Sequence, residues 1–318
     1  MTTTIEPGLE PRQNAGLDGG LSKRPSRQPR VGQTRRGRIG RTGKYALLIL
    51  FVIVVMMPVY VLFVTSLKPP ADVNPATSWG WPTRWPWEPV AEGGPTGFDN
   101  WTTAWTALSP ALGRTFLLAI PAALISSFLG SMNGFVLSRW RFPHADLVFT
   151  FILFGMFIPY QAIMTPLVQM KTSFGLPSDI STLLIVHIIY GLPICTLIFR
   201  NYYVSIPAEL MEASRVDGAG MLRTFASIVL PLSLPGFVVT IIWQFTSAWN
   251  DYLFALFLSD TAGGPVSLAL NNLAQGAQLA NYGAAMAGAL IASLPTLLVY
   301  IILGKYFIGG LMSGSVKS

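Results

Sequence analysis

One polar stretch between two long apolar runs determines how the rest of the chain is interpreted. It reads Ile206-Pro-Ala-Glu-Leu-Met-Glu-Ala-Ser-Arg-Val-Asp-Gly-Ala-Gly220 and continues Met-Leu-Arg-Thr-Phe-Ala-Ser-Ile-Val-Leu-Pro231. Pro207 suits the first turn of a helix, where the missing N–H costs nothing. Gly218 and Gly220 can end that helix in a left-handed turn. The sequence therefore predicts a helix here, followed by a second short helix over 221–227.

The composition of this stretch suits contact with a partner. Small residues let another backbone approach closely, and the interspersed charges offer ion pairs: Glu209, Glu212, Ala213, Ser214, Arg215, Asp217, Gly218 and Ala219. Composition alone also fits a plainer alternative, a solvated helical loop between two membrane spans.

The overall composition is that of a membrane protein. Of 318 residues, 52% are hydrophobic and 11% are charged, whereas soluble domains carry about 25% charged residues. The single cysteine, Cys195, excludes a disulfide framework. His144 and His187 are too far apart for a local metal motif. No catalytic constellation is evident, so we expect neither an enzyme nor a resident metal or cofactor.

The first 44 residues form a basic tail. They hold ten of the 21 Lys and Arg residues and almost no large apolar side chains, a composition that predicts disorder. Nucleic-acid binding is not expected, because no folded module accompanies these charges. The simpler interpretation is an orientation signal that stays in the cytoplasm, with contact to anionic lipid.

Six apolar runs follow the tail, each long enough to cross a bilayer. They cover residues 45–66, 112–137, 147–170, 181–203, 228–257 and 285–303. The sequence thus predicts an all-α membrane domain over 45–310 with six transmembrane helices, and a C-terminal tail over 311–318. Gly130 and Gly134 lie among small residues spaced for close helix packing.

Charge sets the predicted orientation. The segments expected in the cytoplasm carry Arg139, Arg141, Arg200, Arg215, Arg223, Lys305 and Lys317. The Trp-rich loop over 68–109 carries more acidic than basic residues and is expected outside. Both termini and the 206–227 loop then lie in the cytoplasm.

Polar residues within the spans are candidates for a transport path, because hydrocarbon tolerates them only beside a cavity or a partner. Asn250 and Asp251 are the first choice, with the aromatic residues Trp249 and Tyr252 beside them. Gln244 lies about two helical turns before Asp251, on a similar face. Asn133, Gln161 and His187 are further candidates. For each of these polar groups the alternative is an interhelical hydrogen bond.

The loop resembles a known motif. Glu212-Ala213-Ser214, Asp217-Gly218-Ala219, Phe225, Ile228 and Leu230-Pro231 are similar to the "EAA" loop of ABC-importer membrane subunits. In that family the loop is a coupling helix, seated in a cleft of a separate ATPase subunit. Ser214 stands where the family usually has a second Ala, so the resemblance implies that Ser214→Ala is close to neutral.

Other segments resemble the carbohydrate-uptake class of these permeases, which includes the second membrane subunit of the maltose importer. They are Phe98-Asp99-Asn100-Trp101, Trp249-Asn250-Asp251-Tyr252-Leu253 and Leu268-Ala269-Leu270-Asn271-Asn272-Leu273. The Asn-Asn-Leu segment and Leu294-Pro295-Thr296-Leu297 look most like glucose/mannose-type permeases. An α-glucoside, maltose or trehalose permease is the alternative.

The resemblance implies a set of partners in a bacterial or archaeal plasma membrane. They are a second permease subunit, two ATPase subunits that bind ATP and Mg, and an extracytoplasmic sugar-binding protein. Two other classes stay open at this point. An ion-coupled secondary transporter would need ionisable residues in mid-span and usually an internal repeat, and a membrane enzyme would need an acid–base or metal group.

Overall fold

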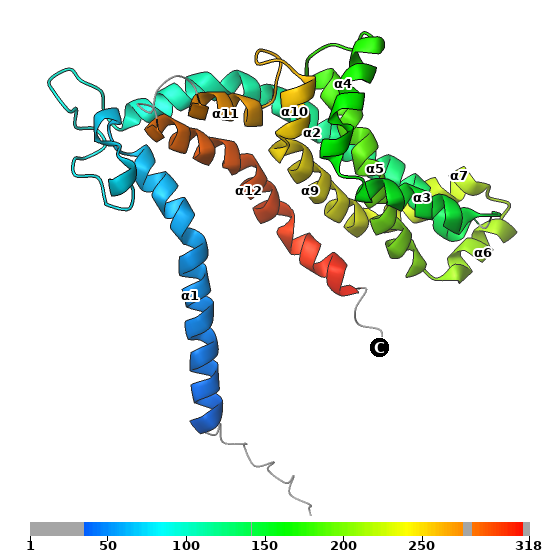
Figure 1. Ribbon diagram of the computed structural model, residues 1–318. Coiled ribbons are helices and arrows are strands. Elements are labelled where there is room, and N and C mark those ends of the chain that lie inside the picture. The colour runs from blue at the N-terminus through cyan, green and yellow to red at the C-terminus, as the bar shows by residue number, and fades with distance from the viewer. Residues whose placement is uncertain (1–34, 141, 276–281, 314–318) are drawn as a thin grey trace, which may run out of the picture. The chain divides into compact units, whose positions relative to one another are not determined.

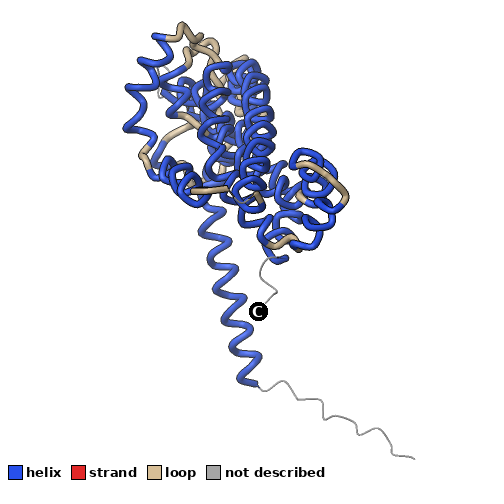
Figure 2. Tube along the Cα trace, turned by 90° about the vertical axis from the view of Figure 1, so that its right-hand side faces the viewer, coloured by secondary structure: helices blue, strands red, loops and turns tan. Residues whose placement is uncertain are grey.

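The computed structural model describes residues 35–140, 142–275 and 282–313. The chain divides into two units, residues 1–54 and 55–318, and each is described by itself. The secondary structure of the described residues is helical, without a strand (Figure 2). This confirms the predicted all-α class.

Helix α1, Arg35–Ser66, begins ten residues before the predicted start of the first span. Its apolar side chains from Leu47 to Met57 are exposed, as suits a lipid-facing helix. Residues 1–34 of the predicted basic tail lie outside the described residues. A loop with two short 3₁₀ turns, η1 (Pro70–Asp72) and η2 (Pro75–Thr77), follows α1.

Helix α2, Phe98–Arg139, is longer than predicted and begins at the Phe-Asp-Asn-Trp segment. Residues 98–109, which were expected in a loop, are therefore helical. The reason lies in side-chain bonds that fix this end of the helix. Asp99 accepts hydrogen bonds from the N–H and hydroxyl of Thr96, and buried Asn100 donates to the carbonyls of Ser66 and Lys68.

Helix α5, Ile180–Val204, packs along α2, as Figure 1 shows. The two backbones approach closely at two glycines of α2. A Cβ on Gly130 would lie 2.4 Å from the Cβ of Cys195, and one on Gly134 would lie 2.8 Å from the backbone nitrogen of Arg200. Side chains larger than hydrogen do not fit, which confirms the packing role expected for these small residues.

Two of the predicted spans are bent rather than continuous. Helix α3 (Ala145–Phe157) and the η3–α4 segment (η3, Tyr160–Ile163; α4, Met164–Ser173) meet at 88°. Pro159 lies at this bend, where Ile158 before it is extended, as residues before proline prefer to be. The span predicted over 147–170 is therefore broken at a proline within it, and the two helices count as one span if the bent pair is taken together.

The second bend lies between the 221–232 segment and α9. Helix α7 (Met221–Thr224), a π-helical segment η4 (Phe225–Val229) and α8 (Leu230–Leu232) lead to α9, Leu234–Asn250, at 78°. The predicted short helix thus ends at Thr224. Pro231 and Pro235 flank the bend, and each removes a backbone donor that a straight helix would use.

The last elements complete the described chain. Helix α6 (Ala208–Val216) forms the loop after α5, and α10 (Leu253–Leu258) follows a break at Asp251 and Tyr252 in what was predicted as one span. Helices α11 (Val266–Gln275) and α12 (Tyr282–Ser313) pack on α2. Four of the described helices are long and apolar enough to span a membrane, and the count is six if each bent pair is one span.

Candidate functional sites

A fork of hydrogen bonds from Arg139 holds helix α6 in place. The charge distribution predicts that this end of the fold faces the cytoplasm. The Arg139 side chain, at the last residue of α2, donates to the carbonyls of Tyr203 and Ile206, and at 3.3 Å to that of Val204. These carbonyls end α5 and begin the loop, so they have no intrahelical partner. One guanidinium therefore joins the ends of α2 and α5 to the segment that carries α6.

The turn after α6 has the geometry expected of a glycine cap. Gly218 has φ of +73°, and the N–H of Ala219 donates to the carbonyl of Ser214 at 2.9 Å. This confirms the left-handed turn predicted for Gly218. Gly220 has φ of −72° and is extended, so the same expectation was wrong for Gly220. The turn returns the chain so that α7 lies beside α6.

The predicted coupling residues fall on two sides of α6. Ser214 and Met211 are buried against the rest of the fold. Glu209, Glu212, Ala213, Arg215, Asp217 and Gly218 are exposed, and Ala219 is half-buried. Three apolar side chains are exposed beside these charges, with Leu210 at 40%, Val216 at 88% and Leu222 at 64%. The segment thus offers solvent a mixed charged and apolar surface, as expected of a helix that meets a protein partner.

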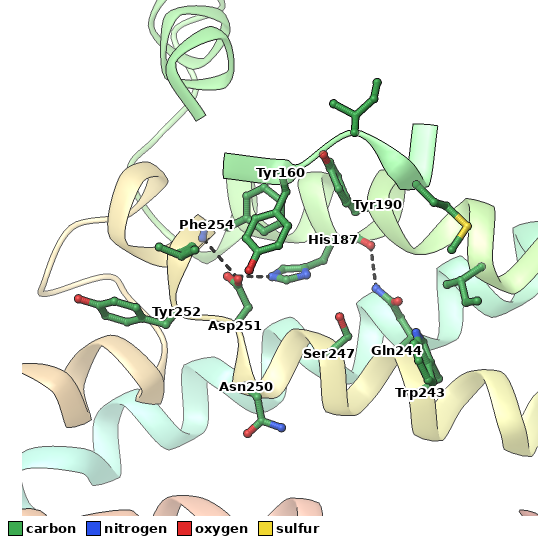
Figure 3. A pocket seen from close by; sticks show the side chains of 14 residues that line it. Tyr160, His187, Tyr190, Trp243, Gln244, Ser247, Asn250, Asp251, Tyr252 and Phe254 are labelled. Atoms are coloured by element: carbon green, nitrogen blue, oxygen red, sulfur yellow. Dashed lines mark hydrogen bonds and ion pairs between the residues drawn. The ribbon is translucent and has the colours of Figure 1, made fainter. Parts of the chain in front are cut away.

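A second candidate site is a cavity of about 490 Å³ on the other side of the bend at Ser233. It lies where α5 and α9 meet the two chain interruptions at Pro159 and Asp251, and Figure 3 shows its lining. The lining is Met156, Ile158, Tyr160, His187, Tyr190, Ile194, Trp243, Gln244, Ser247, Asn250, Asp251, Tyr252, Leu253 and Phe254.

The polar centre of this cavity is a pair formed by His187 and Asp251 (Figure 3). His187 Nε2 lies 3.5 Å from an Asp251 oxygen, and the imidazole is 3% exposed. The Asp251 carboxylate accepts hydrogen bonds from the N–H groups of Phe254 and Ala255, 3.4 and 3.3 Å away. The break between α9 and α10 therefore fixes the carboxylate beside the imidazole.

The other predicted path residues have different surroundings. Gln244 is buried and donates to the carbonyl of His187 at 2.8 Å. Asn250 is exposed, and in Figure 3 its amide points away from Asp251. Tyr252 is half-buried and also lines a neighbouring cavity of about 380 Å³. Gln161 is exposed in η3. It is not one of the described residues that line the cavity of about 490 Å³, which we call the His187 cavity.

Trp249 lies in the core rather than in the His187 cavity. Its indole is 1% exposed, stacks on Phe245 with 5.4 Å between ring centroids, and donates to the carbonyl of Ala292 at 2.9 Å. Trp249 borders the neighbouring cavity of about 380 Å³ instead, so its role as an aromatic platform for a sugar stays a prediction. The exposed ring that does line the His187 cavity belongs to Trp243, about two helical turns earlier.

His187 was one of the polar candidates within the spans, but it was not ranked with Asn250 and Asp251. Its distance of 64 positions from Asp251 in sequence hides their pairing. The available signal was its position in the middle of a largely apolar run, since an ionisable residue in mid-span marks a functional site by default.

The comparisons with known proteins fit this geometry. A family model described as "Binding-protein-dependent transport system inner membrane component" matches residues 124–311, more than half of the chain. The chain belongs to this family. The matched region contains both the α6 segment and the His187 cavity.

Individual relatives agree with the family, and a solved structure shares the fold. A probable ABC transporter permease of Pyrococcus horikoshii is 50% identical over 52% of this chain and 60% of its own length. The xylose/arabinose import permease XacI of Haloferax volcanii is 32% identical over 85% of this chain and 92% of its own. A crystal structure of a bacterial ABC transporter involved in the import of the acidic polysaccharide alginate matches with a TM-score of 0.69 at 21% identity, over 86% of this chain and 98% of that one.

In this inner membrane component, helix α9 connects the bend after the α6–α7 segment to the His187 cavity. The α6–α7 segment lies before the bend at Ser233, and the His187 cavity lies at the far end of α9. Buried hydroxyls fix the bend itself. The Tyr203 hydroxyl lies 2.5 Å from that of Ser131 and accepts from that of Ser233 at 3.0 Å.

Proposed function

We propose that this inner membrane component is one of two membrane subunits of an ATP-driven sugar importer. In this proposal α6 is the coupling helix, and separate ATPase chains bind ATP and Mg. An extracytoplasmic binding protein delivers the sugar, and this chain has no catalytic role of its own. Both termini lie in the cytoplasm.

The observation that carries the proposal is the surface of α6. Its buried side is fixed by Arg139 and Ser214, while its free side presents Glu212 next to the apolar residue Val216. A rigid helix with charged and apolar groups facing solvent suits docking into a cleft of another protein. Similarity to a xylose/arabinose import permease supports a sugar as cargo.

The exposed carboxylate of Glu212 provides the test. Glu212 also lines a cavity of about 580 Å³ between the end of α2 and α6, together with Arg139 and Arg215. Removing one partner of a desolvated charge pair costs about 2 to 5 kcal/mol, mainly because the other charge is left unpaired. We therefore expect Glu212→Ala to weaken docking of the ATPase and to abolish ATP hydrolysis stimulated by binding protein and sugar.

The measurement is pull-down of the ATPase subunit by the purified permease pair, followed by ATP turnover with binding protein and sugar. Glu92→Ala, in the loop before α2, is the matched control because Glu92 is equally an exposed carboxylate. Full stimulated turnover in Glu212→Ala would contradict the role of α6 in coupling.

The specific sugar is a finer question. The resemblance of the Asn-Asn-Leu and Leu-Pro-Thr-Leu segments favours a glucose/mannose-type sugar, with α-glucosides, maltose or trehalose as the alternative. Binding of a panel of these sugars to the partner binding protein, by calorimetry, distinguishes them.

One observation favours a second candidate function, an ion-coupled transporter. His187 and Asp251 form an ionisable pair inside the apolar part of the chain, and such pairs occur in proton-driven carriers. Uptake into proteoliposomes separates the two candidates. An ATP-driven importer needs ATP on the side of the ATPase subunits and continues when a protonophore collapses the pH gradient, whereas a proton-coupled carrier stops.

A further inference from the structure

The His187 cavity has the features of a built binding site. Two interrupted helices meet at it, one at Ile158 and Pro159 and the other at Asp251 and Tyr252. Non-helical backbone at membrane depth is tolerated where it lines a cavity or is buried in protein. Broken helices of this kind form the substrate sites of many transporters. The volume of the His187 cavity, about 490 Å³, falls in the range of small-molecule sites, about 300 to 1,000 Å³.

The polar groups in the cavity are few and fixed. The edge of the His187 imidazole meets the Phe254 ring at 83°, with 5.6 Å between ring centroids. Apart from its 3.5 Å contact with Asp251, which is an ion pair only if the imidazole is protonated, the Nε2 atom has no hydrogen-bond partner in the part of the chain that the structure describes. The Asp251 carboxylate beside it is held by two N–H groups of α10. The Asp251 side chain is 13% exposed and that of His187 is 4% exposed, so the carboxylate is the more accessible of the two groups to a sugar hydroxyl.

The remaining walls are mostly apolar or aromatic. Tyr160, Tyr190 and Trp243 supply ring surfaces, of which Trp243 is 54% exposed. Aromatic bodies with polar tips suit a ligand that has both C–H faces and hydroxyl groups. These walls fit a sugar without selecting for its charge.

The charged side chains in the cavity lining determine which ligand charge the cavity accepts. Asp251 supplies a carboxylate, and none of the described lining residues is Lys or Arg. Resting on the proposed function, we propose that this cavity accepts uncharged sugars and excludes acidic ones such as uronates, and that Asp251 is the residue that determines this selection. The alginate importer shares the fold at 21% identity, which leaves the cavity chemistry free to differ.

The size of the effect follows from electrostatics. We consider a carboxylate about 8 Å from a second unit charge, at a dielectric constant between those of water and of the protein interior. The carboxylate repels an anion and attracts a cation, and the two effects together change the ratio of cation entry to anion entry by about tenfold. A cavity with low-dielectric walls strengthens this bias rather than screening it.

Two thiol reagents of opposite charge test the proposal. Ser247 is exposed in the cavity, so Ser247→Cys places a thiol there, and Cys195→Ala removes the native thiol, which is fully buried. The rates of modification by cationic trimethylammonium-ethyl methanethiosulfonate and by its anionic sulfonatoethyl counterpart are measured in the assembled complex at pH 8. The other subunits of the complex are prepared without reactive cysteines, and the sulfonate stands in for a uronate carboxylate.

The matched control is Ser293→Cys. Ser293 is exposed in the neighbouring cavity of about 380 Å³, whose described lining holds no charged residue. We expect the cation-to-anion rate ratio to be about tenfold higher at Ser247→Cys than at Ser293→Cys, because one site has a carboxylate and the other has none. Asp251→Asn keeps an oxygen that can accept from the α10 N–H groups, and it should bring the two ratios together.

Equal ratios at the two positions, a ratio at Ser247→Cys that Asp251→Asn leaves unchanged, or no reaction at Ser247→Cys with either reagent would each overturn the proposal. The rates need neither ATP nor binding protein. A complex that imports no sugar therefore still reports the charge selection, which separates failure of this inference from failure of the proposed function.

Discussion

The hydroxyl oxygens of Ser214 and Thr224 lie 3.0 Å apart and form a buried hydrogen bond. Ser214 belongs to α6 and Thr224 ends α7, so this bond ties the two helices together across the turn at Gly218. The Ser214 hydroxyl also donates to the carbonyl of Met211 at 3.0 Å. The interpretation of Ser214 as a simple stand-in for Ala therefore overlooks a contact between helices.

Ser214→Ala should loosen the α6–α7 pair rather than leave it unchanged. Loss of a buried hydrogen bond costs about 1 kcal/mol, which raises the opening of a locally unfolding segment about fivefold. Hydrogen exchange of the α6 amides measures this. Thr224→Val should have a similar effect, and the double variant should add little, because both changes break the same bond. Unchanged exchange in both single variants would show that the bond contributes nothing.

Gly218 and Gly220 offer a matched pair for testing the turn. A Cβ added to either glycine would meet no other atom within 4 Å, yet only Gly218 has positive φ. A side chain at Gly218 costs about 1 to 2 kcal/mol of backbone strain, and β-branching adds to it. Gly218→Val should therefore reduce sugar-stimulated ATP turnover without removing a charge, while Gly220→Val retains it. Equal loss in both variants would assign the effect to the added bulk.

Arg139 should be needed for its several donors rather than for its charge. A lysine at this position keeps the charge but cannot form the fork in which Arg139 Nε reaches the carbonyl of Tyr203 while the terminal Nη2 reaches that of Ile206. We expect Arg139→Lys to increase hydrogen exchange over 206–216 and to lower stimulated ATP turnover nearly as much as Arg139→Gln. A fully active Arg139→Lys variant would show that positive charge alone suffices.

Trp249 and Asn250 should behave differently although they are neighbours in sequence. Trp249 is buried, and replacing a buried Trp by Ala costs about 3 to 5 kcal/mol, so Trp249→Ala should lower the yield of assembled complex. Asn250 is exposed and its amide bonds within α9, to the carbonyl of Thr246, so Asn250→Ala should assemble normally. Size-exclusion chromatography and thermal unfolding measure this; normal assembly of Trp249→Ala would contradict its core role.

Topology is tested by labelling from either side of the membrane. A cysteine at Glu92 should react with an impermeant reagent added outside, and one at Arg215 only after the cytoplasmic face is opened. Both positions are exposed, and Glu92 is preferable to Gly93 because the latter has φ of +71°. The reverse labelling pattern would contradict both the charge argument and the assignment of α6.

The sequence predicted the features that depend on local patterns. Apolar runs located the membrane segments, the distribution of Arg and Lys indicated an orientation, and Gly218 marked the end of α6. The bends of 88° and 78° were not predictable in this way. Pro159 indicates a break, but the angle depends on how α4 packs against α10, which are far apart in sequence.

The candidate site was predicted only in part for the same reason. Asp251 stood out within its segment, but its partner His187 lies on another helix, and only the fold brings the two together. For Trp249 the sequence motif suggested a role that the packing does not share. Its place in a motif suggested a ligand contact, whereas burial by Phe245 and Phe116 decides that it packs in the core.

Helix α9 gives the bend at Ser233 a mechanical consequence. Its 17 residues form a rod about 25 Å long, with the hydroxyl cluster of Tyr203 and Ser233 at one end and Asp251 just beyond the other. If the bend acts as a fulcrum, a tilt of about 10° moves the far end of a rod of this length by about 4 Å. That displacement exceeds the reach of a hydrogen bond. A small rotation beside α6 is thereby enough in amplitude to separate Asp251 from His187.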